Sequence, residues 1–269
     1  MKAQIVIVFA LVAAVGCGKD ESPTSPSSST LASLSITPAT DLITIKGSET
    51  FTVTGTYSDG STRTVQATWG TDNAGIATVD ASGRASGVAS GQASIIADAQ
   101  GQRATRLLRV VPDYHGRWRG DWQVTGCADE GDWRGACAEF PSQSLFGLSL
   151  VLSQTRDTVS GTTDFGDDLP GAVTGTIRMD GPLVLGGTYP VVLEEIPMEI
   201  TVGSWETVTT DNERMTGRFR LTLRAAGLRG SIGIDGEVRI AAKTSSSMLS
   251  TTAGARGLHG AIAGGLRRR

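Results

Sequence analysis

Apolar and polar residues alternate with a period of two along most of the chain, which is the pattern of β-strands with one buried face. The run LFGLSLVLSQT (145–155) places Leu148, Leu150 and Leu152 on one face and mostly small polar residues on the other. The run MTGRFRLTLR (215–224) alternates three apolar residues with arginine and threonine in the same way. No ten-residue helical period interrupts the strands between residues 114 and 242. The pattern therefore predicts an all-β protein.

Turn signals divide these strands into two groups. Asp59-Gly60 separates two short strands of the first group and Asp180-Gly181 separates two of the second, and glycine suits the backbone of tight hairpin turns. The short, regularly spaced strands of residues 33–112 predict an Ig-like β-sandwich. About eight longer strands in 113–243 predict an antiparallel β-barrel or a curled meander sheet, since closure removes exposed strand edges. Residues 244–269 are rich in serine, glycine and alanine, and we expect a disordered tail.

Three separated motifs of the first group resemble one known family. The chain reads ITP, then GSETFTVTGTYSDG, then TWGTDNAGIATVDASGRASGVASGQASI, in that order and with matching spacing. This combination resembles the bacterial Ig-like group 2 (BIG2) domain. The resemblance implies a sandwich whose centre is filled by Trp69, with turns at Gly83, Gly87 and Gly91. It further implies a module seen in surface adhesins, lipoproteins and carbohydrate-active enzymes, where it often acts as a spacer.

The first sixteen residues have the layout of a secretory signal peptide. Lys2 precedes a short apolar segment, IVIVFALVAAV (5–15), which is too short to span a membrane. The segment that ends in Ala14-Val15-Gly16-Cys17 resembles the lipobox of bacterial lipoproteins, although Ala14 occupies a position where that family prefers leucine. The resemblance implies cleavage after Gly16 and lipidation of Cys17. The alternative is an ordinary signal peptide followed by an incidental cysteine.

The segment after the cysteine predicts a flexible tether at residues 17–32. GKDESPTSPSSST (18–30) contains no hydrophobic residue and two prolines, so it cannot contribute to a core. A random coil of this length spans roughly 20 Å, which holds a domain just clear of a membrane surface. Gly18 after the cysteine favours the outer membrane by resemblance to the sorting rule of enteric bacteria. We therefore predict a bacterial cell-envelope protein attached to the membrane by an N-terminal lipid, on its periplasmic or its surface face.

The two remaining cysteines lie close together in the second domain. Cys127 and Cys137 enclose the loop ADEGDWRGA, and we expect them to form a disulfide in an oxidising compartment. A metal site that uses these two cysteines is the alternative, but only His115 lies nearby as a further ligand. The odd cysteine of the three, Cys17, is then left for the lipid.

Other chemistry is weakly supported. The net charge of −3 gives no indication of nucleic-acid binding, and the chain has only two histidines. It contains none of the common nucleophile, zinc-hydrolase or phosphate-binding motifs. Two acidic groups have the oxygen ligands of a calcium site, but neither matches a calcium-binding loop, and nothing in the sequence pairs them as glycosidase carboxylates. We therefore expect no catalytic residue, metal or cofactor. The acidic groups are Asp129, Glu130 and Asp132, and Asp164, Asp167 and Asp168.

The second domain is predicted to be a binding module rather than an enzyme. Trp118, Trp122, Trp133 and Trp205 either line an apolar or sugar-stacking pocket or plug the barrel, and we favour the plug. The leading hypothesis is a lipid-anchored envelope protein in which a BIG2 spacer presents the barrel for adhesion to a surface protein or glycan. The alternative is a carrier of a small hydrophobic ligand, because the opening Gly116-x-Trp118 looks weakly like that of lipocalins. An envelope hydrolase is the third and least supported hypothesis.

Overall fold

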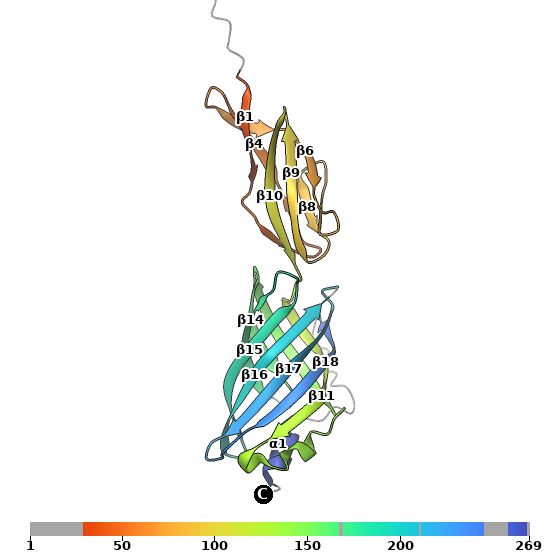
Figure 1. The fold of residues 1–269 in the computed structure, drawn as a ribbon, viewed down its shortest axis with the longest axis vertical. Coiled ribbons are helices and arrows are strands. Elements are labelled where there is room, and N and C mark those ends of the chain that lie inside the picture. The colour runs from red at the N-terminus through yellow and green to blue at the C-terminus, as the bar shows by residue number, and fades with distance from the viewer. Residues whose placement is uncertain (1–28, 167–168, 210, 245–257, 268–269) are drawn as a thin grey trace, which may run out of the picture.

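The computed structural model describes residues 29–166, 169–209, 211–244 and 258–267. They form two β-domains, one after the other along the molecule, and the α-helix α1 lies at the far end of the second domain (Figure 1). The predicted signal peptide, Cys17 and nearly all of the predicted tether lie outside the described residues.

Ten strands build the first domain, and they form three small sheets. One sheet has the order β1-β4-β5, the second β2-β10-β9-β6 and the third β3-β8-β7. Strand β2 pairs in parallel with β10, whereas the other paired strands are antiparallel. Gly60 has a positive φ of 80° in the predicted hairpin turn between β4 and β5. The strands are β1 (Leu31–Thr37), β2 (Leu42–Thr44), β3 (Ser48–Thr50), β4 (Thr52–Tyr57), β5 (Thr62–Val65), β6 (Thr68–Thr71), β7 (Ala77–Val79), β8 (Arg84–Gly87), β9 (Gly91–Ala99) and β10 (Gln102–Val111).

The centre of this sandwich differs from the expectation. Phe51 is fully buried and packs with Ile95, Leu108 and other aliphatic side chains. Trp69 is only partly buried and packs against the edge of this core, beside the turn at Gly83. The prediction that Trp69 fills the centre is therefore wrong, because its place on β6, the last strand of its sheet, brings the indole to the margin of the core.

Eight strands build the second domain, and they form a closed barrel in which each strand pairs with the next. The ladder between β11 and β18 closes the barrel and runs from the pair Arg117 and Thr244 to the pair Asp129 and Ile232. The expected all-β fold, an Ig-like domain followed by an antiparallel barrel, is thus confirmed. The strands are β11 (Gly116–Asp129), β12 (Leu145–Thr155), β13 (Thr158–Asp164), β14 (Pro170–Ile177), β15 (Leu183–Leu193), β16 (Ile196–Thr209), β17 (Arg214–Ala225) and β18 (Ile232–Thr244).

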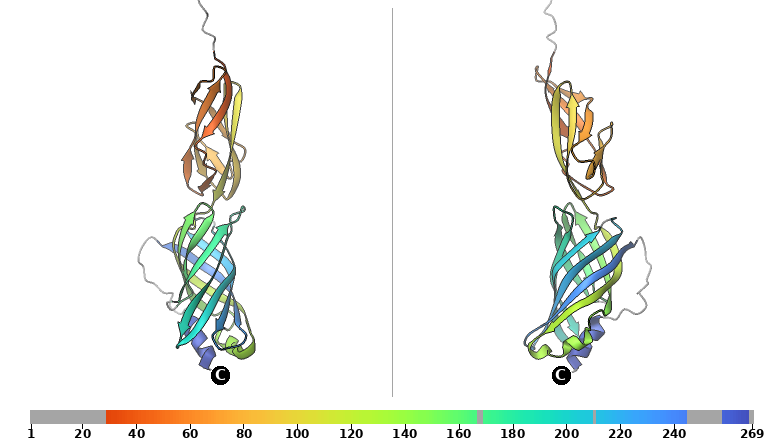
Figure 2. Two further views of the ribbon diagram at one scale, coloured as in Figure 1. Left: turned by 90° about the vertical axis from the view of Figure 1, so that its left-hand side faces the viewer. Right: turned by 45° about the vertical axis from the view of Figure 1, so that its right-hand side comes forward.

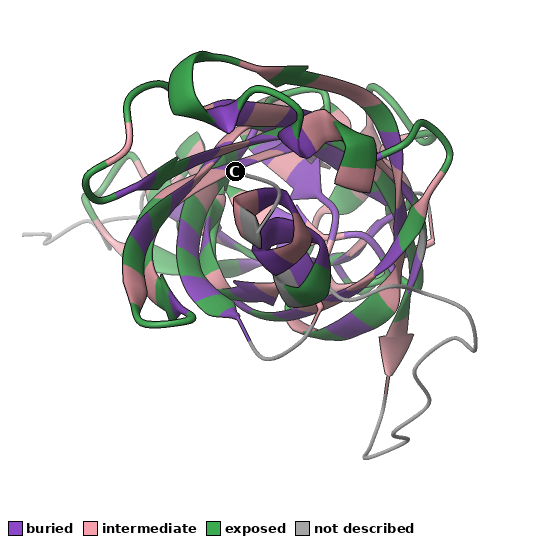
Figure 3. Cartoon of the chain, turned by 90° about the horizontal axis from the view of Figure 1, so that it is seen from below, coloured by how far each residue is buried: buried purple, intermediate pink, exposed green. Residues whose placement is uncertain are grey.

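Alternate residues of each barrel strand point into the interior, as the sequence pattern predicts. Leu148, Leu150 and Leu152 are buried, whereas Val151 and Ser153 between and beyond them are exposed. Figure 3, which looks into the barrel from below, shows this alternation of buried and exposed positions along the strands. The apolar interior positions form one continuous core that extends from Val111 at the Ig-like domain to Ile262 at the opposite end.

Part of the tail departs from the expected disorder. Helix α1 (Leu258–Arg267) lies across the lower opening of the barrel (Figures 1 and 3). Leu258, Ala261 and Ile262 are buried in the barrel core. The expectation of a disordered tail up to residue 269 is corrected for this segment, because its apolar residues recur at helical spacing and find a surface to cover.

Candidate functional site

The two domains are joined by side chains that bind the turns at the upper end of the barrel, the end that faces the Ig-like domain in Figure 1. Arg109, near the end of β10, places Nη1 2.9 Å from Asp157 Oδ2, and its Nη2 donates to the carbonyl oxygen of Ile177 at 2.7 Å. Its side chain is only 13% exposed, so solvent screens this ion pair less than an ordinary surface pair. One residue of the Ig-like domain thus holds two turns of the barrel.

A second contact uses the turn between β16 and β17. Asn212 Nδ2 donates to the carbonyl oxygen of Ile45, and Asn212 Oδ1 accepts a hydrogen bond from the amide of Asp113, both at 3.0 Å. On the outside, Arg156 binds Asp41 at 2.7 Å, and this guanidinium holds the pKa of Asp41 below its usual value. Each contact joins residues that are far apart in the chain. They limit rotation of one domain against the other.

The connection between the domains is itself buried in the barrel. Tyr114 is fully buried, and its hydroxyl lies 3.2 Å from the carbonyl oxygens of both Gly181 and Thr207. Burial raises the pKa of Tyr114, so the phenol stays protonated and can donate at any physiological pH. Gln154 holds the segment on either side, because Oε1 accepts from the amide of Tyr114 and Nε2 donates to the carbonyl of Pro112. The connection is therefore a fixed part of the structure and not a free linker.

Replacing Arg109 with alanine is expected to loosen the two domains against each other. The change leaves Asp157 and the Ile177 carbonyl without this donor, and the loss weakens the contact between the domains by about 1–3 kcal/mol. NMR relaxation should then give separate tumbling times for the domains, in place of one shared value. The matched control is Arg103→Ala on the same strand, whose partner Asp98 lies within the Ig-like domain. A shared tumbling time in both variants contradicts the role given to Arg109.

The four tryptophans of the barrel are all buried, so none is exposed for stacking on a sugar. Trp122 lies 4.8 Å from Phe146 and 5.1 Å from Phe219, measured between ring centroids. Trp205 in turn lies 5.4 Å from Phe219 and 5.6 Å from Phe165. These five rings form one aromatic cluster that occupies the interior between the walls. The arrangement supports the interpretation of the tryptophans as filling. They are Trp118, Trp122, Trp133 and Trp205.

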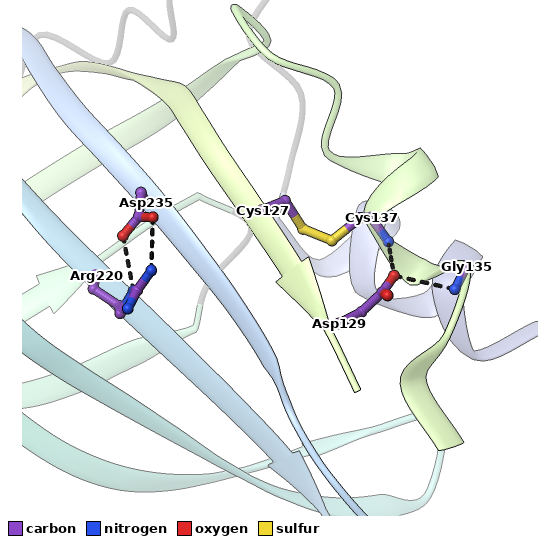
Figure 4. The surroundings of a disulfide bond; sticks show 6 residues. All are labelled: Cys127, Asp129, Gly135, Cys137, Arg220 and Asp235. Atoms are coloured by element: carbon purple, nitrogen blue, oxygen red, sulfur yellow. Dashed lines mark hydrogen bonds and ion pairs between the residues drawn. A yellow bond between two sulfur atoms is a disulfide. The ribbon is translucent and has the colours of Figure 1, made fainter. Parts of the chain in front are cut away.

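The lower end of the barrel is closed by the disulfide loop. Cys127 on β11 and Cys137 in the short 3-10 helix η2 (Ala136–Glu139) form the predicted disulfide. Asp129 accepts hydrogen bonds from the amides of Gly135 and Cys137, at 3.1 and 2.9 Å (Figure 4). A second 3-10 helix, η1 (Gly131–Trp133), carries Trp133 into the core. The loop is therefore fixed by a covalent bond, by a carboxylate and by a buried ring.

The acidic residues at this end of the barrel accept hydrogen bonds from backbone amides and from a hydroxyl group. Glu130 accepts a hydrogen bond from the Ser231 hydroxyl at 3.0 Å, and Asp132 accepts one from the amide of Arg229 at 2.8 Å. Asp164 binds the amide of Gly166 in its own turn, and Asp167 and Asp168 lie outside the described residues. Within the described part of the chain, no group of three or more histidine, cysteine or acidic residues is placed to hold a metal ion. These carboxylates therefore act as loop acceptors in the arrangement seen here.

Helix α1 completes the lower end by packing on η2. A β-carbon added at Gly264 would lie 3.0 Å from the Glu139 side chain, and one at Gly265 would lie 3.1 Å from Ala136. The two glycines thus permit a close approach, and a β-carbon at either position would require η2 or the Glu139 side chain to shift slightly. Among the described residues, no helix is both long enough and apolar enough to cross a membrane.

Sequence reasoning missed the residues that join the domains. Arg109, Tyr114 and Asn212 carry no local motif, because the partners that fix the joint lie 40 to 167 positions away in the chain. The sequence did contain a signal for α1. Ala261 and Ile262 follow Leu258 by three and four positions, which is the spacing of residues on one face of a helix.

The fold defines an all-β, two-domain protein with a filled barrel and a fixed joint between the domains. Residues 31–107 match the family model of the bacterial Ig-like domain (group 2), which confirms the expected BIG2 assignment for this part of the chain. That family consists of Ig-like modules and is not an enzyme family. No curated protein matches the chain.

Two solved structures of surface-layer proteins show a distant likeness. "Structure of the S-layer protein SbsC, domains 5-6" is 16% identical, covers 77% of this chain and 97% of that chain, and has a TM-score of 0.29. "Structure of surface layer protein SbsC, domains 4-9" is also 16% identical, covers 77% of this chain and 31% of that chain, and has a TM-score of 0.30. These values are too low to assign a shared architecture or function.

Proposed function

We propose that the protein is a non-enzymatic, lipid-anchored protein of the bacterial cell envelope. In this proposal the Ig-like domain is a rigid spacer, and the barrel is the module that contacts a surface protein or glycan. The observation that carries the proposal is the fixed joint at Arg109, Tyr114 and Asn212. A joint of this kind keeps the barrel at a constant distance from whatever holds the N-terminus.

The positions of the two ends support the same proposal. The chain enters the Ig-like domain at the end away from the barrel, and α1 lies at the opposite end of the molecule (Figure 1). A lipid on Cys17 would therefore place the Ig-like domain next to the membrane and the barrel beyond it. Two or three acyl chains suffice for stable anchoring, at about 0.8 kcal/mol for each buried CH₂ group. The outer membrane is the proposed location, because the residue that follows Cys17 is Gly18, which favours that membrane by resemblance to the sorting rule of enteric bacteria.

The carrier hypothesis receives less support. A carrier needs an open apolar cavity, whereas the cluster of Trp122, Trp205 and three phenylalanine rings occupies the middle of this barrel. We therefore favour contact through the outer surface of the barrel.

Mass spectrometry of the mature protein tests the anchor. We expect cleavage after Gly16 and a diacylglyceryl group on the Cys17 sulfur, with the protein recovered in the membrane fraction. The Cys17→Ser variant should lose the lipid mass and leave that fraction. An unmodified Cys17, or cleavage at another bond, contradicts the anchor. Protease treatment of intact cells then reports whether the barrel reaches the outer surface.

A further inference from the structure

The outer wall of the barrel is divided into an uncharged half and a charged half. The uncharged half consists of β12, β13, β14 and β15, which the structure describes completely and in which Asp164 is the one charged residue. The left-hand view of Figure 2 turns these strands, in green and turquoise, toward the viewer. Asp164 is an outward residue at the end of β13, and we name the other outward residues the uncharged face: Leu145, Ser149, Val151, Ser153, Thr155, Thr158, Ser160, Thr162, Pro170, Ala172, Thr174, Thr176, Val184, Thr188, Pro190 and Val192.

The other half of the wall carries charges on every strand. Strand β17 presents a row of arginines, and neighbouring strands place carboxylates beside some of them. Arg220 binds Asp235 through two hydrogen bonds of 2.8 Å, and Arg218 lies in register between Glu206 and Glu237. This half is thus a solvated surface that carries both signs of charge, with one ion pair between β17 and β18 at Arg220 and Asp235. The outward arginines are Arg117, Arg119, Arg214, Arg218, Arg220, Arg224 and Arg239.

The uncharged face has the properties of a surface that is covered by a partner. Desolvating charged groups is the largest penalty for covering a protein surface, and covering this face removes a single charged group of its four strands from water, Asp164 beside the hollow described below. Serine and threonine side chains are short and lose little conformational entropy when they are covered. Three larger apolar side chains are exposed here: Leu145 and Val151 are each 42% exposed and Val192 is 68% exposed. A hollow of about 410 Å³, lined by Ser149, Val151, Thr162, Thr163, Asp164 and Pro170, gives the face relief.

We propose that this face docks onto the same face of a second copy of the chain. In a two-fold contact each surface meets itself, so an uncharged face meets no like charge, whereas the arginine row of β17 would oppose another arginine row. The face is roughly 20 Å wide and 25–35 Å long, from a strand spacing of about 4.8 Å and a rise of about 3.4 Å per residue. That outline is on the scale of the roughly 800 Å² per partner of a standard interface.

The direction of the face supports the choice of a second copy. It runs along the side of the barrel, parallel to the long axis of the molecule (Figure 2). A two-fold axis in this direction brings both Ig-like domains to the same end of the dimer. This step rests on the proposed anchoring, because two chains held in one membrane share that orientation and have a raised effective concentration.

Sedimentation of purified protein tests the proposal. The chain from residue 17 onward with Cys17→Ser carries no lipid, so the result is independent of the anchor, which mass spectrometry tests separately. We expect a concentration-dependent dimer. Thr162→Glu adds a carboxylate to the middle of the uncharged face and should weaken the dimer about tenfold or more, because each copy then buries a like charge. Thr162→Ala keeps the face uncharged and should preserve the dimer.

The matched control is Thr216→Glu, an exposed threonine of β17 between Arg214 and Arg218. It should leave the dimer within about twofold of the unsubstituted chain, since a carboxylate there is solvated and lies among arginines. Unchanged thermal melting of each variant shows that it is folded. A chain that stays monomeric up to about 100 μM, which corresponds to a binding free energy weaker than roughly −5.5 kcal/mol, overturns the proposal. Equal weakening by the two glutamates also overturns it.

Discussion

Replacing Trp122 with alanine is expected to lower the free energy of unfolding of the barrel by about 3–5 kcal/mol. The indole is fully buried and contacts Phe146, Phe165 and Phe219, with centroid distances from 4.8 to 6.1 Å. Its loss removes apolar burial and leaves a cavity in the middle of the aromatic cluster. Walls formed by closed strand ladders cannot collapse to fill such a cavity. We therefore expect the upper part of that range.

Chemical denaturation measures this effect, with near-ultraviolet circular dichroism as the probe of aromatic packing. Trp122→Phe keeps a ring in the cluster and should cost clearly less than the alanine variant. Trp69→Ala is the control for the other domain, because Trp69 packs against the margin of the Ig-like core. This variant should lower the denaturant concentration at which the Ig-like domain unfolds and leave that of the barrel unchanged. A barrel that unfolds at the same denaturant concentration with and without Trp122 would show that the cluster contributes little.

Removing the disulfide, as Cys127→Ser together with Cys137→Ser, should destabilise the barrel by about 2.5–3 kcal/mol. The two cysteines are separated by 10 positions, and a loop of this length loses about that much unfolded-state entropy on closure in the chain-entropy model. We expect the lower end to respond first, because the loop then keeps only its noncovalent contacts, among them those of Asp129, Asp132 and Trp133. Amide exchange should accelerate at Gly135 and at position 137, whose N–H groups donate to Asp129 in the unsubstituted protein.

The control for this experiment is the third cysteine. Cys17 lies outside both domains in the sequence, so Cys17→Ser should leave the unfolding of the barrel unchanged. Reduction of the unsubstituted protein should reproduce the effect of the double serine variant. Equal stability of the reduced and oxidised protein would mean that native contacts alone hold the loop.

The strands of both domains could be predicted because each depends on a local pattern. Alternation along β12 and β17 identifies the buried side of each strand without knowledge of its neighbours. Turn residues such as Gly60 mark where the chain reverses, since its positive φ suits glycine. The disulfide could be predicted for the same reason, because a short loop brings its own ends together.

Features that depend on contacts between distant segments could not be predicted. Trp69 was expected at the centre of the sandwich on the strength of the family resemblance, but its place on the last strand of its sheet moves it to the margin. Helix α1 contains glycines, which disfavour a helix in isolation, and its packing on η2 and on the barrel core offsets that low helix propensity. The acidic groups looked alike in sequence, yet Asp129 accepts from amides of its own loop, whereas Asp132 accepts from the amide of Arg229 in the turn between β17 and β18.

The closure of the barrel has a consequence for the order in which the chain folds. Strand β11 pairs with β18, so one edge of residues 116–129 stays unpaired until residues 232–244 are available to complete the wall. Every strand of the Ig-like domain, in contrast, lies within residues 31–111. A chain that is synthesised from its N-terminus can therefore complete the Ig-like domain first, and the ladder of long sequence separation makes barrel closure the slow step. Until residue 244 has emerged, β11 keeps an open edge, and this interval is when the chain is most exposed to aggregation.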